Sequence, residues 1–492
     1  MNSFILSKWS AFERVLLSII VTLTALRLFS LPFYPFLDRS EARYALIPLH
    51  MLISGNWVTP SIDGHTPFWS KPPLSFWLTA LSYKEFGINE FAGRLPSFLG
   101  FVATLWLVFW IGRKMRDRAF GLLSAAIFGS MGFVYFQAGA VMTDPGLALC
   151  VTLSMAAFWA AMTGTGKLSG YLVFVGFGLA LLVKGPIGIV LPALGMLAWI
   201  VFQGQWREVF SRLPVVTGTL LMLAIAAPWY ILAESRTPGF LQYFIVGEHI
   251  GRYLEPGWKG SLYEPGLKAP IGMVWLFAIF ASLPWSVFVV WLAARHFWRK
   301  RPSLLWLRQH PDICFLLCWA VVPLIFLTFS RNLLVTYVLP LAPAFALLTA
   351  FVIRAARAER SLFAFALMAI APLLGIFMIG FVQLRPDSIS IPSQSRMIAL
   401  WKQQRGAQDE PLYYIFQKPY SADFYTRTRA ENIRTRSDID DFPNKPPPFF
   451  FIVREKDVAW LSSASLQKAT LIGSRNGTLL YRTRQAPAPS NN

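Results

Sequence analysis

The segment Asp38–Pro73 reads DRSEARYALIPLHMLISGNWVTPSIDGHTPFWSKPP, and it is the first long interruption in a chain that otherwise runs apolar. Ionisable side chains are crowded into it, directly after an apolar segment long enough to cross a membrane. They are Asp38, Arg39, Glu41, Arg43, His50, Asp63, His65 and Lys71. Because an unpaired charge beside a bilayer is costly, this grouping favours a functional role over packing.

The composition is that of a polytopic membrane protein. Of 492 residues, 55% are hydrophobic and 14% are charged, and the mean hydropathy is +0.49, which excludes an ordinary soluble domain. The net charge of +20 is spread in small groups between apolar runs, so we expect membrane lipid and no nucleic acid as a partner. Cys150, Cys314 and Cys318 lie in apolar segments, which favours neither a disulfide framework nor a thiolate metal site.

Apolar runs near the length that a membrane-spanning helix needs predict about eleven spans. They lie near 13–33, 92–112, 119–138, 141–162, 169–183, 186–203, 213–233, 271–294, 312–329, 333–353 and 361–383. The first span, with Lys8 and Arg14 at its start, has no small-residue cleavage signal after it, so we expect an uncleaved signal anchor. The absence of an evident internal repeat argues against a transporter built from paired repeats.

Loop charge predicts the orientation of these helices. One set of loops is short and rich in Lys and Arg, and we expect it on the cytoplasmic side together with the N-terminus. The other set is longer and of mixed charge, and is expected to face the periplasm: 34–91, 139–146, 234–270 and 330–332.

The composition turns polar after Gln383, which predicts a membrane domain over 1–383, with 34–91 as an outer loop, and a small outer α/β domain over 384–492. In the second domain, strands are expected at Leu412–Phe416 and Phe449–Val453, helices at Asp423–Arg429 and Lys456–Ser462, and a disordered tail at the end. Asn476-Gly477 predicts a hairpin turn between two further strands.

The outer loop predicts a helix at Glu41–Ser54 on the membrane face, kinked at Pro48, and an extended, proline-stiffened segment that holds Lys71. A purely structural explanation also exists. Asp38 or Ser40 would cap the helix, while Arg43 and Lys71 would extend to lipid headgroups.

Further polar residues interrupt or flank the later spans. Asp144 either caps a helix or lines a cavity, and Lys184 either faces that cavity or extends to the interface. The run Glu248-His249-Ile-Gly-Arg252 places an acid, an imidazole and a guanidinium within one or two helical turns, which suits contact with a phosphate, although a lone His is often structural. Arg331 is a natural phosphate ligand. Tyr337 is either a ligand contact or part of the interfacial aromatic belt.

Several stretches together resemble a known family. They are SEARYALIPLHMLISGNWVTP, FWSKPPLSFWLTALSYKEFGINEFAGRLPS, VMTDPGLA, LLVKGPIG, AAPWYI, FIVGEHIGRYL, SLPW, SRNLLVTYVLP and PYSADFYTRTRA, which extend over nearly the whole chain. In order and spacing they resemble the bacterial aminoarabinose transferase and protein-mannosyltransferase group of polyprenyl-phosphate-dependent glycosyltransferases, which have the GT-C fold.

The resemblance implies a multi-pass inner-membrane enzyme that acts as a monomer. It would move a sugar from a polyprenyl carrier, typically undecaprenyl phosphate, to a periplasmic-side acceptor such as lipid A or another glycolipid. A protein acceptor, a lipid or solute transporter, and a membrane scaffold are the alternatives.

The resemblance also implies site residues. The catalytic carboxylate is Asp38 or Glu41, because Ser40-Glu41 stands where the aminoarabinose transferases carry Asp-Glu; we favour Asp38, with Asp144 as a second acid. Substrate-binding residues would be Arg43, Tyr44, Lys71, Lys184, His249, Arg252, Arg331 and Tyr337. No cofactor is identified and no metal ligand is assigned. A divalent metal fits the resemblance, but Ser70 replaces a Glu that in relatives can help bind a metal, which argues against it.

This set predicts an inverting transfer. Lys71, Arg43, Arg252 and Arg331 would neutralise the departing lipid phosphate. Asp38 or Glu41 would be the general base for a hydroxyl acceptor and would position an acceptor that is already anionic.

Overall fold

The computed structural model describes residues 9–164, 166–263, 266–297, 303–384, 391–405, 410–440, 442 and 445–484. Lys8 and the predicted tail after residue 484 lie outside these ranges. The chain forms two compact units. The helical unit is Met1–Pro32 with Met51–Met378, and the mixed unit is Phe33–His50 with Ile379–Asn492. The beginning of the predicted outer loop therefore belongs to the mixed unit, whereas the division into domains 1–383 and 384–492 stays a prediction.

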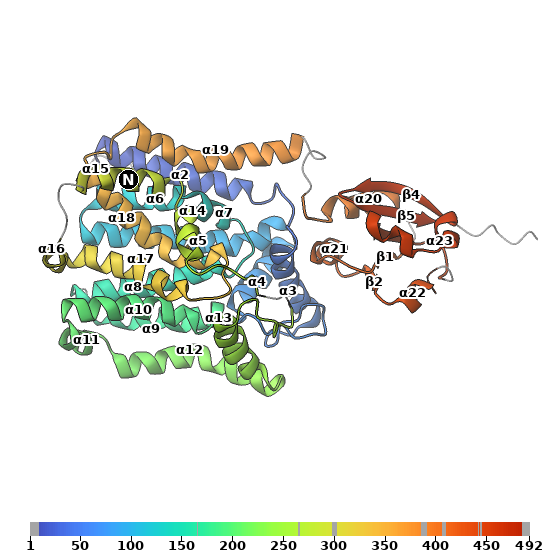
Figure 1. The fold of residues 1–492 in the computed structure, drawn as a ribbon, viewed down its shortest axis with the longest axis horizontal. Coiled ribbons are helices and arrows are strands. Elements are labelled where there is room, and N and C mark those ends of the chain that lie inside the picture. The colour runs from blue at the N-terminus through green and yellow to red at the C-terminus, as the bar shows by residue number, and fades with distance from the viewer. Residues whose placement is uncertain are drawn as a thin grey trace, which may run out of the picture. The chain divides into compact units, whose positions relative to one another are not determined.

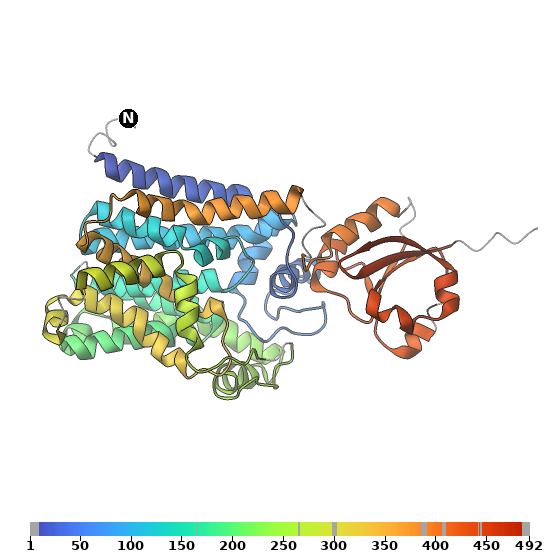
Figure 2. The same cartoon turned by 45° about the horizontal axis from the view of Figure 1, so that its top comes forward.

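Long helices lie side by side in the helical unit (Figures 1 and 2). The helices up to Arg236 are α2 (Ala11–Ser30), α4 (Leu74–Phe86), α5 (Glu90–Met115), α6 (Arg118–Ser130), α7 (Gly132–Gln137), α8 (Asp144–Met162), α9 (Lys167–Lys184), α10 (Ile187–Gln203), α11 (Trp206–Arg212) and α12 (Val215–Arg236). They are followed by the π-helix η1 (Gln242–Gly251), α13 (Arg252–Leu254), α14 (Met273–Ala281), α15 (Trp285–Phe297), α16 (Leu304–Gln309), α17 (Pro311–Thr328), the 3-10 helix η2 (Val335–Leu341), α18 (Ala342–Ala355) and α19 (Leu362–Leu384). α3 (Ser40–Ser54) confirms the helix predicted in the outer loop, with Pro48 inside it.

Each predicted span coincides with a helix or a pair of helices. In the described chain, seven helices are long and apolar enough to cross a membrane, and up to eight if α14 and α15 count as one bent span. The multi-pass helical fold is thus confirmed. The count of about eleven stays a prediction, because α6 and α10 are shorter and α2 carries more charge than a typical span.

Two predicted continuous helices are wrong. The span at 271–294 is broken between α14 and α15, which are bent by 98° relative to each other, and the span at 119–138 is broken between α6 and α7. Pro284 explains the first break, because proline cannot donate a helical hydrogen bond. The two breaks also meet: Gly132 N–H donates to the Leu283 carbonyl oxygen at 2.8 Å, and Trp285 Nε1 donates to Ser130 Oγ at 3.0 Å.

Small residues allow the helices to approach closely. A Cβ added to Gly121 of α6 would lie 2.5 Å from the Phe109 backbone oxygen of α5, so only glycine fits there. The fully buried Arg94 of α5 donates to the Leu31 carbonyl oxygen at 2.7 Å, which satisfies a helix end inside the core.

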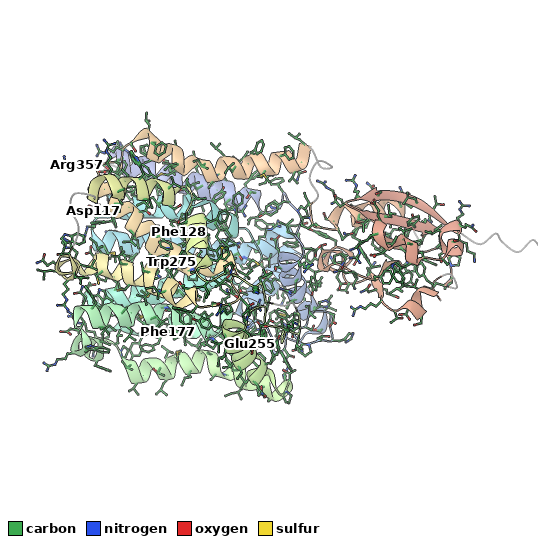
Figure 3. All side chains as sticks on the ribbon, viewed as in Figure 1. Asp117, Phe128, Phe177, Glu255, Trp275 and Arg357 are labelled. Carbon is green, nitrogen blue, oxygen red and sulfur yellow. The ribbon has the colours of Figure 1, made fainter. Side chains whose placement is uncertain are left out.

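Ion pairs join helices at one end of the helical unit. Arg118 binds Glu13 at 2.7 Å, Arg116 binds Asp312 at 2.5 Å, and Arg354 binds Asp117 at 2.5 Å. Figure 3 shows Asp117 and Arg357 at this end and Glu255 toward the other. Residues predicted on the cytoplasmic side and on the outer side therefore lie at different ends of the unit.

A sheet forms the centre of the mixed unit, with the strand order β2-β1-β3-β5-β4. The strands are β1 (Leu412–Ile415), β2 (Glu431–Ile433), β3 (Phe450–Arg454), β4 (Ala469–Arg475) and β5 (Thr478–Thr483), and the helices are α20 (Ser395–Gln404), α21 (Tyr420–Thr426), α22 (Arg436–Asp440), the 3-10 helix η4 (Glu455–Trp460) and α23 (Ser463–Gln467). β1 pairs in parallel with β2 and β3, whereas β5 is antiparallel to β3 and β4.

The sequence predicted most of this domain. The β4–β5 hairpin is confirmed, and Asn476 and Gly477 have the positive φ angles of 51° and 69° that the turn requires. The strands predicted at 412–416 and 449–453 are confirmed as β1 and β3. The predicted helices differ in detail, since α21 begins before Asp423 and η4 is a 3-10 helix.

Candidate functional site

A cavity in the helical unit collects many of the predicted site residues. Its polar and ionisable lining comes from four separate segments of the chain. These residues are Ser70, Lys71, Lys184, Glu248, His249, Arg252, Tyr253, Ser330, Asn332 and Tyr337. The space of about 80 Å³ is enough for several water molecules or a compact anion.

A glycine at the end of α9 shapes one wall of the cavity. Gly185 ends the helix with φ 87°, so the chain turns directly after Lys184. A Cβ at Gly185 would lie 2.6 Å from the Phe244 ring and 3.1 Å from His249 Cε1. The close approach of η1 to this turn therefore requires glycine, and it places Lys184 and His249 on the same cavity.

Glu248 is the centre of the hydrogen-bond network. Its Oε1 accepts from Ser70 Oγ at 3.1 Å and from the Tyr243 hydroxyl at 3.0 Å, while its Oε2 accepts from Arg252 Nη1 at 2.8 Å. Burial alone would raise the pKa of the Glu248 carboxyl, but the charges of Lys71 and Arg252 outweigh it and hold the pKa below its ordinary value. Glu248 therefore stays ionised and fixes the direction of Arg252.

Lys71 has a different environment. Its Nζ donates to the Ser70 carbonyl oxygen at 2.7 Å, and in the described chain no carboxylate lies within ion-pair distance of it. Burial lowers the pKa of Lys71 to about 8, and the charge of Arg252 acts in the same direction while Glu248 opposes it. The ammonium group is thus not neutralised by a direct ion pair, which suits it to binding an anion.

Lys184 forms a buried ion pair instead. Its Nζ lies 2.5 Å from Asp144 Oδ1 and 4.7 Å from the centre of the Tyr337 ring. Asp144 begins α8 but is not among the residues that line the cavity. Its assignment as a second catalytic acid stays a prediction.

His249 is held by its own helix. Its Nδ1 lies 2.7 Å from the Phe244 carbonyl oxygen, and the imidazole contacts the Phe244 ring edge to face. Burial lowers the pKa of His249, which favours the neutral imidazole. These contacts give His249 a structural role, and its role as a ligand contact stays a prediction for a residue that also lines the cavity.

The other predicted residues, Asp38, Glu41, Arg43 and Tyr44, belong to the mixed unit. The carboxylate of Asp38 accepts from the backbone N–H of Ser421 at 2.9 Å and from its hydroxyl, and so caps α21. Burial raises the pKa of Asp38, while the hydrogen bonds from Ser421 oppose that change.

The remaining residues of this group surround the start of α3. Glu41 Oε2 accepts from the Leu37 backbone N–H at 3.1 Å, so Glu41 caps the chain just before α3. The Arg43 guanidinium lies 5.4 Å from the centre of the Tyr44 ring and 5.8 Å from that of Tyr420. Both distances are within the range of cation–π attraction.

Comparison with known proteins shows what the chain is similar to. Residues 34–244 match the family described as dolichyl-phosphate-mannose-protein mannosyltransferase. The chain is 31% identical over 341 residues to the undecaprenyl phosphate-alpha-4-amino-4-deoxy-L-arabinose arabinosyl transferase of Enterobacter sp. (strain 638), which covers 68% of this chain and 58% of the relative. By sequence the chain is therefore similar to aminoarabinose transferases and to protein mannosyltransferases. A second member, from Sodalis glossinidius, is 32% identical over 63% of the chain and 54% of its own length.

Solved structures of the family extend the likeness. The crystal structure of ArnT from Cupriavidus metallidurans bound to undecaprenyl phosphate matches with a TM-score of 0.76 and 19% identity, over 97% of this chain and 100% of that one. The match shows that the two proteins share the GT-C fold. By sequence, the chain matches little more than half of the length of the curated relatives.

Several polar residues of the cavity were not selected from the sequence, and Asn332 and Ser70 are two of them. Asn332 donates to the carbonyl oxygens of Arg252 at 2.5 Å and Glu255 at 2.6 Å, and accepts from Gly257 N–H at 2.9 Å, which fixes the turn that carries Arg252. The Ser-Arg-Asn run was a signal that could have identified Asn332, but only its arginine was selected. Arg331 is not among the residues that line the cavity.

Ser70 also lines the cavity without having been selected as a site residue. The sequence identified it only as a departure from the family pattern. It binds Glu248, which is the single carboxylate among the described residues that line the cavity. Because Glu248 is already engaged by three donors and flanked by cations, the lining does not fit a divalent metal, which needs several free oxygen ligands.

Proposed function

We propose that the chain is an inner-membrane glycosyltransferase that moves a sugar from an undecaprenyl phosphate carrier to a periplasmic-side acceptor such as lipid A or another glycolipid. The names of the Enterobacter and Sodalis relatives support the donor and the reaction class. The Cupriavidus protein, which has the same fold and binds undecaprenyl phosphate, supports the carrier. The enzyme acts as a monomer.

The observation that carries the proposal is the gathering of Lys71, Lys184 and Arg252 on one cavity. Glu248 pairs with Arg252 and Asp144 pairs with Lys184, whereas Lys71 retains an ammonium with no direct ion pair in the described chain. Cations held rigidly in a partly dehydrated site stabilise a phosphate that gains negative charge as it leaves. Arg252 contributes the planar donor geometry that matches phosphate oxygens.

The reaction is an inverting displacement. The acceptor oxygen forms a bond to the anomeric carbon of the sugar while the bond from that carbon to the carrier phosphate breaks, and the electron pair remains on the phosphate. Lys71 and Arg252 hold this leaving group. For a hydroxyl acceptor the proton passes to a carboxylate, and Asp38 is the preferred base because its buried carboxyl has a raised pKa, whereas Glu41 caps α3.

The positions of the positively charged loop residues support the proposed orientation in the membrane. The loops that carry Arg116, Arg118 and Arg354 are short and basic, so the N-terminus and these loops face the cytoplasm and the mixed unit faces the periplasm. A reporter enzyme that is active only in the periplasm, fused after the mixed unit, should be active. Activity of a cytoplasm-specific reporter at the same position would overturn the orientation.

The decisive experiment follows the sugar. The purified chain in lipid nanodiscs is incubated with a radiolabelled undecaprenyl-phosphate-linked aminopentose and with lipid A. Label in lipid A, and its absence when Lys71 is replaced by Ala, is the expected result. If undecaprenyl phosphate does not bind and no lipid-linked sugar is consumed, the proposal fails.

A further inference from the structure

A second cavity lies within the mixed unit and has about 350 Å³ of space, which is within the usual size range for a small-molecule site. Its walls are Pro35, Ile391, residues 393–397, Glu455 and the hairpin residues 474–478. Most of these residues have a polar side chain, in contrast to the aromatic core on the faces of the sheet.

Hydrogen bonds between the walls hold this cavity open. Glu455 N–H donates to the Gly477 carbonyl oxygen at 2.9 Å, and Ser474 Oγ donates to Glu455 Oε1 at 3.3 Å. Asn476 Nδ2 donates to the Ile391 carbonyl oxygen at 3.2 Å. The hairpin, η4 and the segment before α20 are thereby tied together, and the site is formed before a ligand arrives.

The lining matches the chemistry of a charged sugar. Arg396 and Arg475 supply guanidinium groups, which pair with phosphate or carboxylate oxygens. Glu455, together with the amide and hydroxyl side chains of 393–395, supplies the mixed donors and acceptors that sugar hydroxyls require.

The cavity is also connected to Asp38. The backbone N–H of Gln394, on the cavity wall, donates to Ser421 Oγ at 2.9 Å, and this hydroxyl donates to the Asp38 carboxylate. The backbone N–H of Asp38 donates in turn to the Pro392 carbonyl oxygen at 2.7 Å. Gln394 on the cavity wall is therefore bonded to the serine that holds Asp38, and Pro392, between the wall residues Ile391 and Ser393, is bonded to Asp38 itself.

We infer that this cavity binds an anionic saccharide and is the acceptor-recognition site of the enzyme. The inference rests on the proposed function, because it assigns to that reaction a site for the acceptor, separate from the cavity that holds Lys71. Binding of the saccharide at 391–397 would act on Asp38 through Pro392 and Ser421.

Binding to the full-length chain in nanodiscs tests the inference, with glucosamine 6-phosphate as the probe and with glucosamine and inorganic phosphate as separate arms. Arg475→Glu should weaken binding of glucosamine 6-phosphate at least about tenfold, because it replaces a charge-assisted bond with repulsion. The matched control is Arg434→Glu, which changes an exposed arginine after β2, at the opposite edge of the sheet, and should leave the affinity unchanged.

Undecaprenyl phosphate binding, measured on the same samples, separates this inference from the proposed function. Normal carrier binding with no binding of the phosphosugar, or equal phosphosugar affinity in both variants, overturns the acceptor site alone. Binding of inorganic phosphate as tightly as glucosamine 6-phosphate overturns the saccharide assignment. If the unmodified chain does not bind undecaprenyl phosphate, the result counts against the proposed function instead.

Discussion

Ser421 donates both its backbone N–H, at 2.9 Å, and its hydroxyl to the carboxylate of Asp38, which precedes it by 383 positions. The contact joins the start of the outer loop to the first turn of α21. It gives Asp38 a fixed direction and an acceptor role at a helix N-terminus, where a carboxylate is favourable. The same contact also opposes the rise in the pKa of Asp38 that burial causes.

Removal of the Ser421 hydroxyl should therefore shift the pH dependence of transfer. In Ser421→Ala one of the bonds that lower the pKa of Asp38 is lost, so that pKa rises further above its ordinary value. Since a general base must be ionised, the acid limb of the pH–rate profile should move to higher pH. Ser421→Thr retains a hydroxyl and is the control. An unshifted profile for Ser421→Ala would remove Asp38 from the role of base.

Substitution of the two outer-loop carboxylates should separate their roles. Asp38→Asn should reduce the rate of transfer to a hydroxyl acceptor by about 100-fold or more, the usual contribution of a general base. Glu41→Gln keeps an oxygen acceptor for the Leu37 N–H, so it should mainly lower thermal stability by about 1 kcal/mol or less. Single-turnover rates and melting curves measure the two effects. If both variants transfer at the normal rate, neither residue is the base.

Lys71→Ala should weaken binding of undecaprenyl phosphate by roughly tenfold or more, since a charge-assisted contact to phosphate is lost. Lys84→Ala is a matched control, because Lys84 is exposed on α4 and is not among the cavity residues. Affinity is measured by titration of the carrier into each variant, and melting curves show whether folding is retained. Equal affinities for the two variants would remove Lys71 from the phosphate site.

The sequence predicted those features that depend on local pattern. The length of the apolar runs located the helices, and the dipeptide Asn476-Gly477 located the hairpin. Each of these patterns lies within the element that it predicts. The break at Met131 was missed because it depends on a distant contact, the bond from Gly132 to Leu283. The break at Leu283 had a local signal in Pro284, but proline also lies inside unbroken helices such as α5 and α17, so it does not identify a break by itself. The Asp38–Ser421 contact has the same long-range origin.

The candidate site was predictable to the same extent. Lys71, His249 and Arg252 were selected as charged residues of the outer loops, and Lys184 and Tyr337 as polar residues beside spans; the structure brings all five to one cavity. Asn332 was missed, since it acts on backbone groups whose positions no sequence pattern describes.

Carrier binding should weaken at alkaline pH. The pKa of Lys71 is lowered to about 8 by burial, so the ammonium is present below that pH and is lost as the pH rises through it. Affinity for a polyprenyl phosphodiester, whose own charge is constant in this range, should then fall by up to about tenfold per pH unit. Lys71→Arg should remove this decline because its guanidinium stays charged. A decline of the same size in Lys71→Arg would assign it to another group.

Asn332→Ala should weaken carrier binding indirectly, because Asn332 holds the turn that carries Arg252. The amide of Asn332 satisfies the backbone groups of Arg252, Glu255 and Gly257, and its removal leaves buried polar groups unpaired. This should cost about 1–3 kcal/mol of stability and free Arg252 from its fixed position. Asn89→Ala removes the N-cap of α5, which costs a similar ~1 kcal/mol, but should leave carrier affinity unchanged. Both variants lose stability, and melting curves measure each loss. Weaker binding in Asn332→Ala alone would show that Asn332 positions Arg252, whereas equal affinity in both would limit Asn332 to a folding role.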